Sequence, residues 1–407
     1  MESIMKQKTV CVMGLGYIGL PTASVLATKG YDVIGIDIKK EVVETINNGR
    51  VHIVEPDLAA LVRNAVNSGQ LKASLTPVAA HVFIIAVPTP FLEDKSPDLS
   101  FVENSAEAIA PYVSADCLVI LESTSPVGTT ERISSIITQR RPDLIRDGHL
   151  NIHLAHCPER VLPGQILKEI VENDRIVGGI TPEATRRAAE FYRSFVKGAV
   201  ISTTSRTAEL TKLVENSFRD TNIAFANELS LLCDDLDINV WELIQLANRH
   251  PRVNILNPGP GVGGHCLAVD PWFIVSAAPK IARLIRTARE VNERKPEWVI
   301  EKVLACAAKF QHATIGCLGL AYKPNIDDLR ESPALSVAHR LSQTSTATVI
   351  ACEPHVEQVD GVTLVSLPEL LETADIVVGL VRHNQFISLS RAQLEGKVVF
   401  DTCGMFS

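Results

Sequence analysis

One stretch near the N-terminus constrains the fold of this chain more than any other. The apolar run 9–13 is typical of a buried strand, and it leads into Gly14-Leu-Gly16-Tyr17-Ile18-Gly19 and a helix-like stretch. A second strand-like run, 31–36, ends at Asp37, 18 positions after the last of these glycines. Strand, glycine-rich turn, helix and acid-terminated strand, in this order, predict a dinucleotide-binding βαβ unit.

The residue types of this unit favour one dinucleotide. Its glycines let the backbone approach a pyrophosphate, whose charge is met by amides at the helix N-terminus. Asp37 would accept hydrogen bonds from ribose hydroxyls and repel a 2′-phosphate, so NAD is predicted rather than NADP. Thr89 and Thr124 follow two further strand-like runs and are expected to face the same crevice, although capping of the next helices also explains them.

The alternation of strands and helices continues and then changes. Strand-like runs at 82–87 and 117–121 belong to a first domain of residues 1–203. From 206 to 235, apolar residues recur mostly at spacings of three and four, which predicts a long amphipathic helix. This helix opens a helical middle domain, residues 204–309.

Strand-like runs return in the last hundred residues, at 314–320, 347–352, 376–381 and 398–400. They predict a smaller C-terminal domain, residues 310–407. The predicted fold class is therefore α/β, with two Rossmann-like parallel-sheet domains joined by a long central helix and a helical middle domain.

Charge, hydropathy and cysteine usage exclude several classes of protein. A net charge of −8 argues against non-specific binding to nucleic acid. No apolar run approaches the roughly 18 residues that span a bilayer, and no signal-type stretch follows the N-terminus, so a cytoplasmic location and no membrane partner are expected. The nine cysteines occur singly, without a CxxC pair, so neither a disulfide framework nor a metal site is predicted.

One cysteine lies in an unusual context. Cys266 ends the glycine-rich run Gly261-Val-Gly263-Gly264-His265, and Asp270 follows four residues later. Small residues let a substrate approach closely, and the exposed amides of such a loop can lower a thiol pKa or stabilise an oxyanion. The other eight cysteines are interpreted as inert buried residues, which is the usual state of a lone cysteine.

Polar residues on the predicted long helix form a second candidate group. Lys212 and Asn216 are four residues apart and share a face, and Arg219 lies about one turn further on. A solvated polar face is the alternative explanation of this spacing.

Taken together, these motifs resemble the UDP-glucose/GDP-mannose dehydrogenase family from Gly14 to Pro333. The matching segments are GLGYIGLPTA, AVPTPF, LESTSPVGTT, CPERVLPG, AELTKLVENSFRD, NRHPRVNILNPGPGVGGHC, VDPWFIV and GLAYKPNIDDLRESPA.

The resemblance implies that the C6 alcohol of a UDP-sugar is oxidised to a carboxylate by two NAD in turn, through a covalent thioester. It implies six catalytic residues: Cys266 as nucleophile, Lys212, Asn216 and Asp270 in proton transfer and oxyanion stabilisation, and Glu159 and Thr124 in positioning the hydrolytic water. It implies NAD contacts at Gly14, Gly16, Tyr17, Ile18, Gly19, Asp37, Thr89, Thr124 and, from the C-terminal domain, Arg330. It implies sugar-nucleotide contacts at Arg160, Val161, Lys212, Asn216, Arg219, His250, Arg252, Gly263, Tyr322 and Lys323. A homodimer built on the long helix is also implied.

Departures from the family's main branches narrow the expected substrate. The UDP-glucose and GDP-mannose branches carry a serine before the nucleophile and a Lys-Asp pair after it, where this chain has His265 and Val269-Asp270. GGHC and VDP resemble the acetamido-sugar branch, and PWFIV with RTAREVN resembles its N-acetylmannosamine enzymes. UDP-N-acetyl-D-mannosamine is therefore the expected substrate, and the role of Asp270 stays open because its usual lysine neighbour is absent.

Three alternatives remain at this stage. The first is another nucleotide-sugar 6-dehydrogenase, for example one acting on UDP-N-acetylglucosamine. The second is a two-electron β-hydroxyacid dehydrogenase of similar fold, which needs no thiol and releases one NADH per substrate. The third is an NAD-sensing binding protein, for which Cys266, Lys212 and Asn216 would be unnecessary.

Overall fold

A computed structural model describes residues 8–162, 164–264, 266–344 and 346–406. The chain divides into two compact units, the first ending at Val214 and the second beginning at Glu215. The predicted boundary after residue 203 falls one residue before the point where a strand ends at Thr204 and the long helix begins at Ser205. The boundary after residue 309 lies in the connection between a helix that ends at Ala307 and a strand that begins at Thr314. The three-part division itself stays a prediction.

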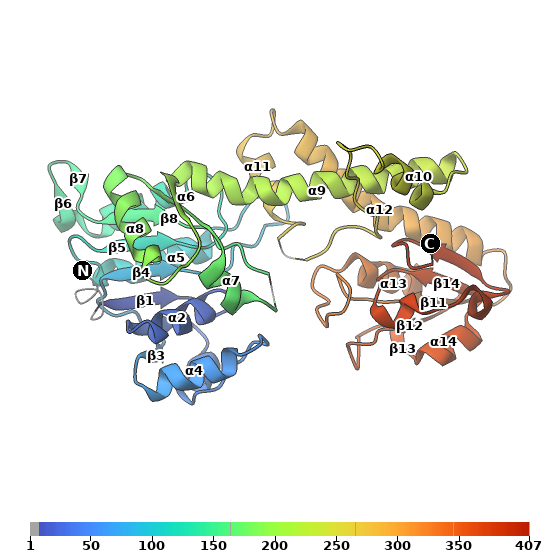
Figure 1. Cartoon of the computed structure of the whole chain (residues 1–407), viewed down its shortest axis with the longest axis horizontal. Helices are drawn as coiled ribbons and strands as arrows, with labels where there is room; N and C mark the ends of the chain where they lie inside the picture. Colours follow the sequence, from blue (N-terminus) through green and yellow to red (C-terminus); the bar gives the residue numbers. More distant parts are fainter. Residues whose placement is uncertain (1–7, 163, 265, 345, 407) are drawn as a thin grey trace. The chain divides into compact units, whose positions relative to one another are not determined.

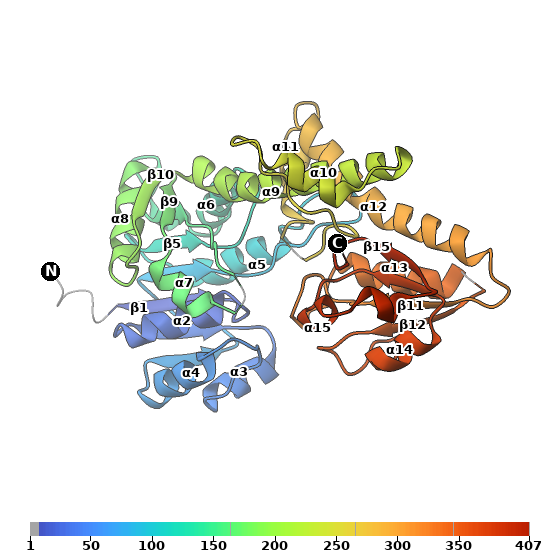
Figure 2. The ribbon, with the colours of Figure 1, turned by 45° about the vertical axis from the view of Figure 1, so that its right-hand side comes forward.

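The first unit is built on an eight-stranded sheet of order β10-β9-β8-β5-β4-β1-β2-β3 (Figure 1). Its strands are β1 (Thr9–Met13), β2 (Asp32–Ile36), β3 (Leu71–Ser74), β4 (Val82–Ile85), β5 (Leu118–Leu121), β8 (His153–His156), β9 (Arg175–Gly179) and β10 (Val200–Thr204), with a separate hairpin of β6 (Ile145–Arg146) and β7 (His149–Leu150). Its helices are α2 (Gly19–Thr28), α3 (Lys40–Asn47), α4 (Leu58–Asn67), α5 (Ser100–Ile109), α6 (Thr129–Arg140), α7 (Ile166–Glu172) and α8 (Pro182–Arg193). Figure 2 shows α3 and α4 together near the β3 edge.

Six of these strands have the order and direction of a Rossmann fold. The strands β3-β2-β1-β4-β5-β8 all run parallel, with Thr9 opposite Asp32 and Val10 opposite Val82 beside the glycine-rich turn. The predicted doubly wound sheet is confirmed for these strands.

The sheet departs from the parallel arrangement at one junction. Strand β9 pairs with β8 in the antiparallel direction, and β10 then runs parallel to β9. Among the described residues of the connection from β8 to β9, the one helix is the short α7, and the connection returns the chain to the sheet at the edge where β8 ends. Because the chain does not cross to the opposite edge, the last two strands run against the other six.

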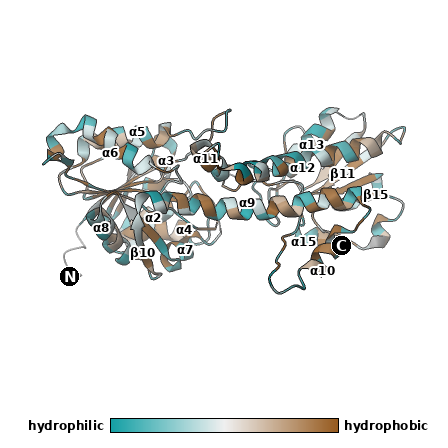
Figure 3. Cartoon of the chain, turned by 90° about the horizontal axis from the view of Figure 1, so that it is seen from above, coloured by the Kyte–Doolittle hydropathy of each residue, from teal (hydrophilic) through white to brown (hydrophobic). Residues whose placement is uncertain are grey.

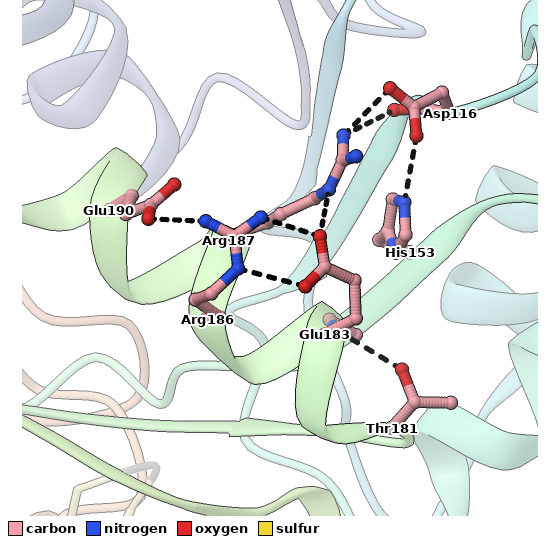
Figure 4. Close-up of polar contacts among 8 residues, drawn as sticks. Asp116, His153, Thr181, Glu183, Arg186, Arg187 and Glu190 are labelled. Atoms are coloured by element: carbon pink, nitrogen blue, oxygen red, sulfur yellow. Dashed lines mark hydrogen bonds and ion pairs between the residues drawn. The ribbon is translucent and has the colours of Figure 1, made fainter.

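A network of charged side chains fixes helix α8 to the strands beside it (Figure 4). Arg187 donates to Asp116 at 2.8 Å and to Glu183 at 2.8 Å, and Asp116 accepts from His153 at 3.1 Å. Hydrogen bonds from Arg186 and then Arg187 lower the pKa of Glu183 to about 2. The network ties α8 to Asp116, two residues before β5, and to His153, the first residue of β8.

The second unit contains a five-stranded sheet of order β13-β12-β11-β14-β15. Its strands are β11 (Thr314–Leu318), β12 (Thr348–Cys352), β13 (Thr363–Leu364), β14 (Ile376–Gly379) and β15 (Val398–Asp401). Its helices are the greater part of α9 (Ser205–Asp235), then α10 (Val240–Ala247), α11 (Asp270–Ala277), α12 (Arg283–Ala307), α13 (Pro333–Thr344), α14 (Leu367–Thr373) and α15 (Asn384–Ile387). All pairings of this sheet are parallel, as predicted.

Both sheets are buried on two faces by apolar clusters. In the first unit one cluster includes Val12 and Ile84, and another includes Cys11 and Phe83, which are the alternate residues of the same strands. The second sheet is likewise covered by two clusters. Near-continuous apolar strands follow from this two-sided burial, since both alternating faces lie in a core.

Helix α9 has the predicted length, but its burial pattern differs from that of an ordinary amphipathic helix, because large apolar residues are exposed and polar residues are buried. Apolar residues on it are exposed, among them Phe218 at 69% and Phe225 at 53%, and brown residues recur along the helix in Figure 3. Its buried positions include polar residues: Asn216, Ser217, Asp220, Asn227 and Ser230.

These polar residues pair with polar residues of α12. Asp220 accepts from Arg289 at 2.7 Å and from Asn292 at 2.8 Å, and both partners are buried. Asn227 donates to Asn292 at 2.8 Å. Lys295 donates to a further α9 residue, the hydroxyl of Ser230, at 2.5 Å. We call these contacts the polar seam of α9 and α12.

Candidate active site

The predicted glycine-rich turn follows β1 and leads into α2, and its three glycines have different steric surroundings. A Cβ on Gly19 would lie 1.9 Å from the carbonyl oxygen of Gly14, and Gly14 itself has a φ of +88°. A Cβ on Gly16 would meet nothing within 4 Å. Two of the glycines therefore close the turn, and the third leaves open space where a ligand can approach the backbone, next to Tyr17 and Ile18 at the start of α2.

Asp37 directly follows β2, where the fingerprint requires an acid. Its Oδ2 accepts from the amide of Leu15 at 3.2 Å and its Oδ1 from the amide of Lys39 at 2.9 Å. These bonds fix the carboxylate beside the glycine-rich turn, and the side chain stays partly accessible. Together with the open space at Gly16, this donor and acceptor set fits NAD.

The loops after β4 and β5 are joined to each other by hydroxyl groups. Thr89 donates its Oγ1 to the carbonyl oxygen of Thr124 at 2.6 Å, and Ser123 donates to that of Val87 at 2.7 Å. Thr89 and Thr124 were predicted separately, and the structure brings them together at the carboxyl edge of the sheet.

Glu159, which follows β8, is held at both carboxylate oxygens. Its Oε2 accepts from Nη1 of Arg175 at 2.6 Å and its Oε1 from the amide of Arg160 at 2.7 Å. Glu159 and Arg175 are 7% and 3% exposed. The ion pair is therefore buried, and it orients the carboxylate that was predicted to position water.

A second buried carboxyl lies close to the same guanidinium. Glu122 accepts from the hydroxyl of Tyr192 at 2.7 Å, and the Arg175 guanidinium lies 5.6 Å from the centre of the Tyr192 ring. Burial, with the negative charge of Glu159, raises the pKa of Glu122 to about 7 against the opposing effect of Arg175. Two buried carboxyls thus lie near one buried cation, and the pKa of the second is raised by burial and by the charge of the first.

Three of the six predicted catalytic residues meet in the second unit. Nδ2 of Asn216 donates to Oδ2 of Asp270 at 2.5 Å, and these residues are 6% and 3% exposed. Asp270 is the first residue of α11, and its amide donates to the carbonyl oxygen of Cys266 at 2.9 Å. Cys266 is exposed, whereas the other eight cysteines are buried or partly buried. The buried carboxylate of Asp270 is therefore bonded to the side-chain amide of Asn216, and the backbone of Asp270 is bonded to that of the exposed Cys266.

The glycine-rich loop before the thiol packs against the segment that follows β11. A Cβ on Gly263 would lie 2.5 Å from the carbonyl oxygen of Glu331, and one on Gly264 would lie 3.1 Å from the ring of Tyr322. No helix or strand occupies 257–264. Gly263 and Tyr322, two predicted substrate contacts, are therefore neighbours, while His265 lies outside the described residues.

Two further predicted contacts, Lys323 and Arg330, lie near residues of the same segment after β11. Lys323 lies with its Nζ 5.8 Å from the ring centre of Tyr322. Arg330 pairs with Asp328 at 2.6 Å and is exposed.

Three further predicted contacts, Arg219, His250 and Arg252, are exposed. Within the described part of the chain, they make no hydrogen bond or ion pair with Cys266. In the first unit, Val161 packs against the apolar core, and Lys212 is partly buried one turn before Asn216 on α9.

Sequence reasoning missed several buried charged residues in the first unit, among them Arg175 and Glu209. Arg175 opens the apolar strand β9, and this charge in an apolar run is a signal that could have found it. Glu209 accepts from the amides of Gly128 and Thr130 at 2.7 and 2.8 Å, and so caps the start of α6 from helix α9. No local pattern reveals Glu209, because its partners are about 80 residues away.

Two kinds of feature are absent from the described residues. None of their helices combines the length and hydropathy needed to cross a bilayer. Their histidines, cysteines and acids form no group of three or more that could hold a metal ion.

Comparison with known families accounts for nearly the whole chain. Residues 8–196 match the NAD binding domain, 206–294 the central domain and 316–407 the UDP binding domain of one family. The chain belongs to the UDP-glucose/GDP-mannose dehydrogenase family. It is an NAD-dependent oxidoreductase of the nucleotide-sugar dehydrogenase type, with the UDP binding domain in its second unit.

Individual relatives cover almost the full length. The chain is 56% identical over 408 residues to the NDP-N-acetyl-D-galactosaminuronic acid dehydrogenase of Ralstonia nicotianae, covering 98% of this chain and 96% of that protein. It is 53% identical to the UDP-N-acetyl-D-mannosamine dehydrogenase of Escherichia coli, covering 99% and 100%. The solved UDP-D-ManNAc dehydrogenase of Pyrococcus horikoshii superposes with a TM-score of 0.88 at 40% identity, covering 98% of this chain and 96% of that one.

Proposed function

We propose that this enzyme oxidises C6 of UDP-N-acetyl-D-mannosamine to a carboxylate in two steps, through a thioester on Cys266. The product, UDP-N-acetyl-D-mannosaminuronate, would serve the synthesis of a bacterial surface polysaccharide. The observation that carries the proposal is the exposed thiol of Cys266 beside the buried pair of Asp270 and Asn216.

Bound NAD supplies the acceptor for the two electrons and the hydrogen that leave carbon in each oxidation. We assign its binding to Gly14, Gly16, Tyr17, Ile18, Gly19, Asp37, Thr89 and Thr124 in the first unit and to Arg330 in the second. The open space at Gly16 and the fixed carboxylate of Asp37 support this assignment.

The first oxidation requires a group that removes the proton of the C6 hydroxyl. The backbone amide of Asp270 donates to the carbonyl oxygen of Cys266, and Nδ2 of Asn216 donates to the Asp270 carboxylate at 2.5 Å. We assign Asp270, with Asn216 and Lys212, to this proton transfer, directly or through a bound water. Lys212 and Asn216 also present a cation and an amide donor on one face of α9 for the oxyanions of later steps.

The thiol then holds the half-oxidised sugar. The sulfur of Cys266 adds to the aldehyde carbon, the C–S bond forms, and the carbonyl oxygen takes up a proton to give a thiohemiacetal. Loss of the remaining hydrogen with two electrons, and of the hydroxyl proton, gives a thioester. Water then adds to the thioester carbon and the C–S bond breaks. The sugar is released as a carboxylate, and Cys266 is regenerated as a thiolate.

Hydrolysis of the thioester needs an oriented water. We assign this to Glu159 and Thr124, and the buried bonds from Arg175 and from the Arg160 amide fix the direction of the Glu159 carboxylate. A fixed carboxylate orients water without having to be reorganised at the moment of attack.

The sugar nucleotide needs both cationic and close-packed contacts. We assign these to Arg160, Val161, Lys212, Asn216, Arg219, His250, Arg252, Gly263, Tyr322 and Lys323. The local basic side chains match a diphosphate even though the whole chain is acidic. The contact of Gly264 with the Tyr322 ring supports a shared role for the thiol loop and the segment after β11.

The identity of the sugar is the finer part of the proposal. The relatives in Escherichia coli and Pyrococcus horikoshii are named for N-acetylmannosamine, and the Ralstonia relative for N-acetylgalactosaminuronate. The second candidate is therefore the N-acetylgalactosamine nucleotide. All of these names describe acetamido sugars, which agrees with the GGHC and VDP sequence pattern.

We also propose a homodimer formed along α9. Leu210, Val214, Phe218, Phe225 and Leu232 are at least 40% exposed and follow one another at spacings of four or seven residues. Residues at these spacings lie along one stripe of a helix. A second copy of the same helix would cover this stripe with matching apolar side chains.

The substrate test compares UDP-N-acetylmannosamine, UDP-N-acetylgalactosamine, UDP-N-acetylglucosamine, UDP-glucose and GDP-mannose, each with NAD. The thioester route yields two NADH for each sugar consumed, and UDP-N-acetylmannosamine is expected to give the highest kcat/KM. One NADH per sugar would refute the four-electron route, and a preference for another sugar would refute the substrate assignment.

Replacement of the thiol tests the mechanism directly. Cys266→Ala is expected to lower acid formation by at least about 10³-fold, with UDP and NAD still bound. Cys306→Ala, at a partly buried cysteine of α12, is the matched control and should keep normal turnover. Normal turnover in Cys266→Ala would remove the thiol from the mechanism.

A further inference from the structure

The second sheet repeats, at its first two strands, the contacts that surround Asp37 in the first sheet. In the first unit Asp37 follows β2, and its carboxylate accepts from Leu15, two residues beyond the end of β1. In the second unit Glu353 follows β12, and its Oε2 accepts from Leu320 at 2.7 Å, two residues beyond the end of β11. Glu353 therefore stands where a dinucleotide-binding fold places its ribose-binding acid.

A second pair of bonds extends the correspondence. Each acid also accepts from the amide two residues after it, Asp37 from Lys39 at 2.9 Å and Glu353 from His355 at 3.1 Å. The likeness is therefore one of geometry as well as of strand order.

The two acids differ in what surrounds them. Glu353 is 7% exposed, and its Oε2 also accepts from Ala321 at 3.1 Å and from Nε2 of His383 at 3.1 Å. Burial works against ionisation, but the bonds from His383 and Leu320 outweigh it, so the pKa of Glu353 lies below its ordinary value. The carboxylate is thus used within the protein and is not presented to a ribose.

His383 is held in one tautomer by its neighbours. The amide of Asn325 donates to Nδ1 at 2.9 Å, so Nδ1 is the acceptor and Nε2 carries the proton that is donated to Glu353. The His383 side chain is fully buried, between the ring of Phe386 at 5.6 Å and that of His355 at 5.0 Å. A chain of bonds therefore runs from Asn325 through His383 to Glu353.

This chain of bonds holds both ends of one short segment. The amides of Leu320 and Ala321 are bound to Glu353 at its start, and the amide of Asn325 is bound to His383 at its end. Between them lie Tyr322 and Lys323, both partly exposed. Asn325 has a φ of +61°, and its side chain accepts from the amide of residue 384, which fixes the end of the segment further.

We propose that the pair of Glu353 and His383 is a positioning element that sets Tyr322 and Lys323 for binding the UDP-sugar. The inference rests on the proposed function of these two residues as substrate contacts. Neither Glu353 nor His383 touches the substrate; each acts through the backbone of residues 320–325.

The imidazole allows a test that separates positioning from general stability. His383→Ala removes both bonds, whereas in His383→Asn the side-chain oxygen can take the place of Nδ1 and accept from Asn325. His383→Ala is expected to raise the Kd for UDP and the KM for the UDP-sugar about tenfold, as loss of the two bonds predicts, with kcat and the KM for NAD within about twofold. His383→Asn is expected to recover part of the loss.

The control is His312→Asn, at an exposed histidine before β11, which should leave all these constants unchanged. Glu353→Gln, which keeps the size of the side chain, is the second variant and should also weaken UDP binding, so the test does not depend on the folding of His383→Ala. Unchanged UDP binding in both variants would overturn the proposal. So would an equal rise in the KM for NAD, or equal defects in His383→Ala and His383→Asn.

Calorimetry with UDP alone separates this inference from the proposed function. UDP binding needs no oxidation step, so the wild type and variants can be compared even if no tested sugar is oxidised. A wild type that oxidises the sugar while the variants bind UDP normally would overturn the positioning role alone.

Discussion

Replacing Glu122 by glutamine is expected to change how the stability of the first unit depends on pH. Glu122 is buried with Glu159 near the buried guanidinium of Arg175, and burial with the negative charge of Glu159 raises its pKa to about 7. The folded protein therefore holds a proton on Glu122 that the unfolded chain releases near pH 4.5. Glutamine imitates the protonated carboxyl and can still accept from Tyr192.

The size of the effect follows from proton linkage. A pKa raised from 4.5 to about 7 corresponds to about 3 kcal/mol of unfolding free energy, at about 1.4 kcal/mol for each pH unit. Because the pKa is raised on folding, this stabilisation is complete below about pH 4.5 and is lost as the pH rises through about 7. From pH 5 to pH 8 the wild type should lose about 2 to 3 kcal/mol that Glu122→Gln does not lose.

Urea unfolding of the full chain between pH 5 and pH 8, followed by far-ultraviolet circular dichroism, measures this difference. The three tryptophans, 241, 272 and 298, all lie in the second unit, so their fluorescence gives an internal reference. Glu107→Gln, at an exposed carboxylate of α5, is the matched control and should follow the wild type. Parallel pH profiles for the wild type and Glu122→Gln would refute the reasoning.

Two other features of the fold give predictions of a different kind. Gly16→Ala should fold normally, because a Cβ at this position meets nothing within 4 Å. It should nevertheless weaken NAD binding about tenfold or more in a calorimetric titration. Gly19→Ala should also lower the melting temperature, because its Cβ would lie 1.9 Å from a carbonyl oxygen. Normal NAD affinity in Gly16→Ala would contradict the assigned pyrophosphate site. Phe218→Glu with Phe225→Glu should convert the proposed dimer to a monomer in analytical ultracentrifugation without loss of helix content, since both side chains are exposed. An unchanged sedimentation coefficient would exclude α9 as the interface.

Local patterns in the sequence were enough to predict the Rossmann topology. The glycine-rich turn, Asp37 and the apolar runs after it each report a local requirement, and β1 has the predicted bounds. The direction of β9 could not be predicted, because it depends on where the connection through α7 rejoins the sheet. An apolar run looks the same whether its strand is parallel or antiparallel.

Helix α9 shows the limit of periodicity more sharply. The spacing of its apolar residues predicts a helix, and the helix is present over Ser205–Asp235. The same spacing would normally mark the buried face, yet Phe218 and Phe225 are exposed and Asp220 is buried. Which face is buried was decided by polar partners on α12, about 70 residues away, which no local window contains.

The candidate site was predictable where one motif carries the chemistry. Cys266 and Asp270 belong to one motif and are adjacent in the structure, and Asn216 joins them through a direct bond. Arg175 and Glu122 escaped prediction, because a buried charge is recognisable only once its partners are placed around it.

The polar seam of α9 and α12 has a consequence for how these two helices are aligned. Apolar side chains slide past one another at small cost, but a shift of one turn, about 5.4 Å, would separate Asp220 from Arg289 and leave both charges buried without a counterpart. The two helices can therefore meet in one register only. Asn216 is one turn from Asp220 along the same helix, so the register of the seam also sets the position of the amide that donates to Asp270.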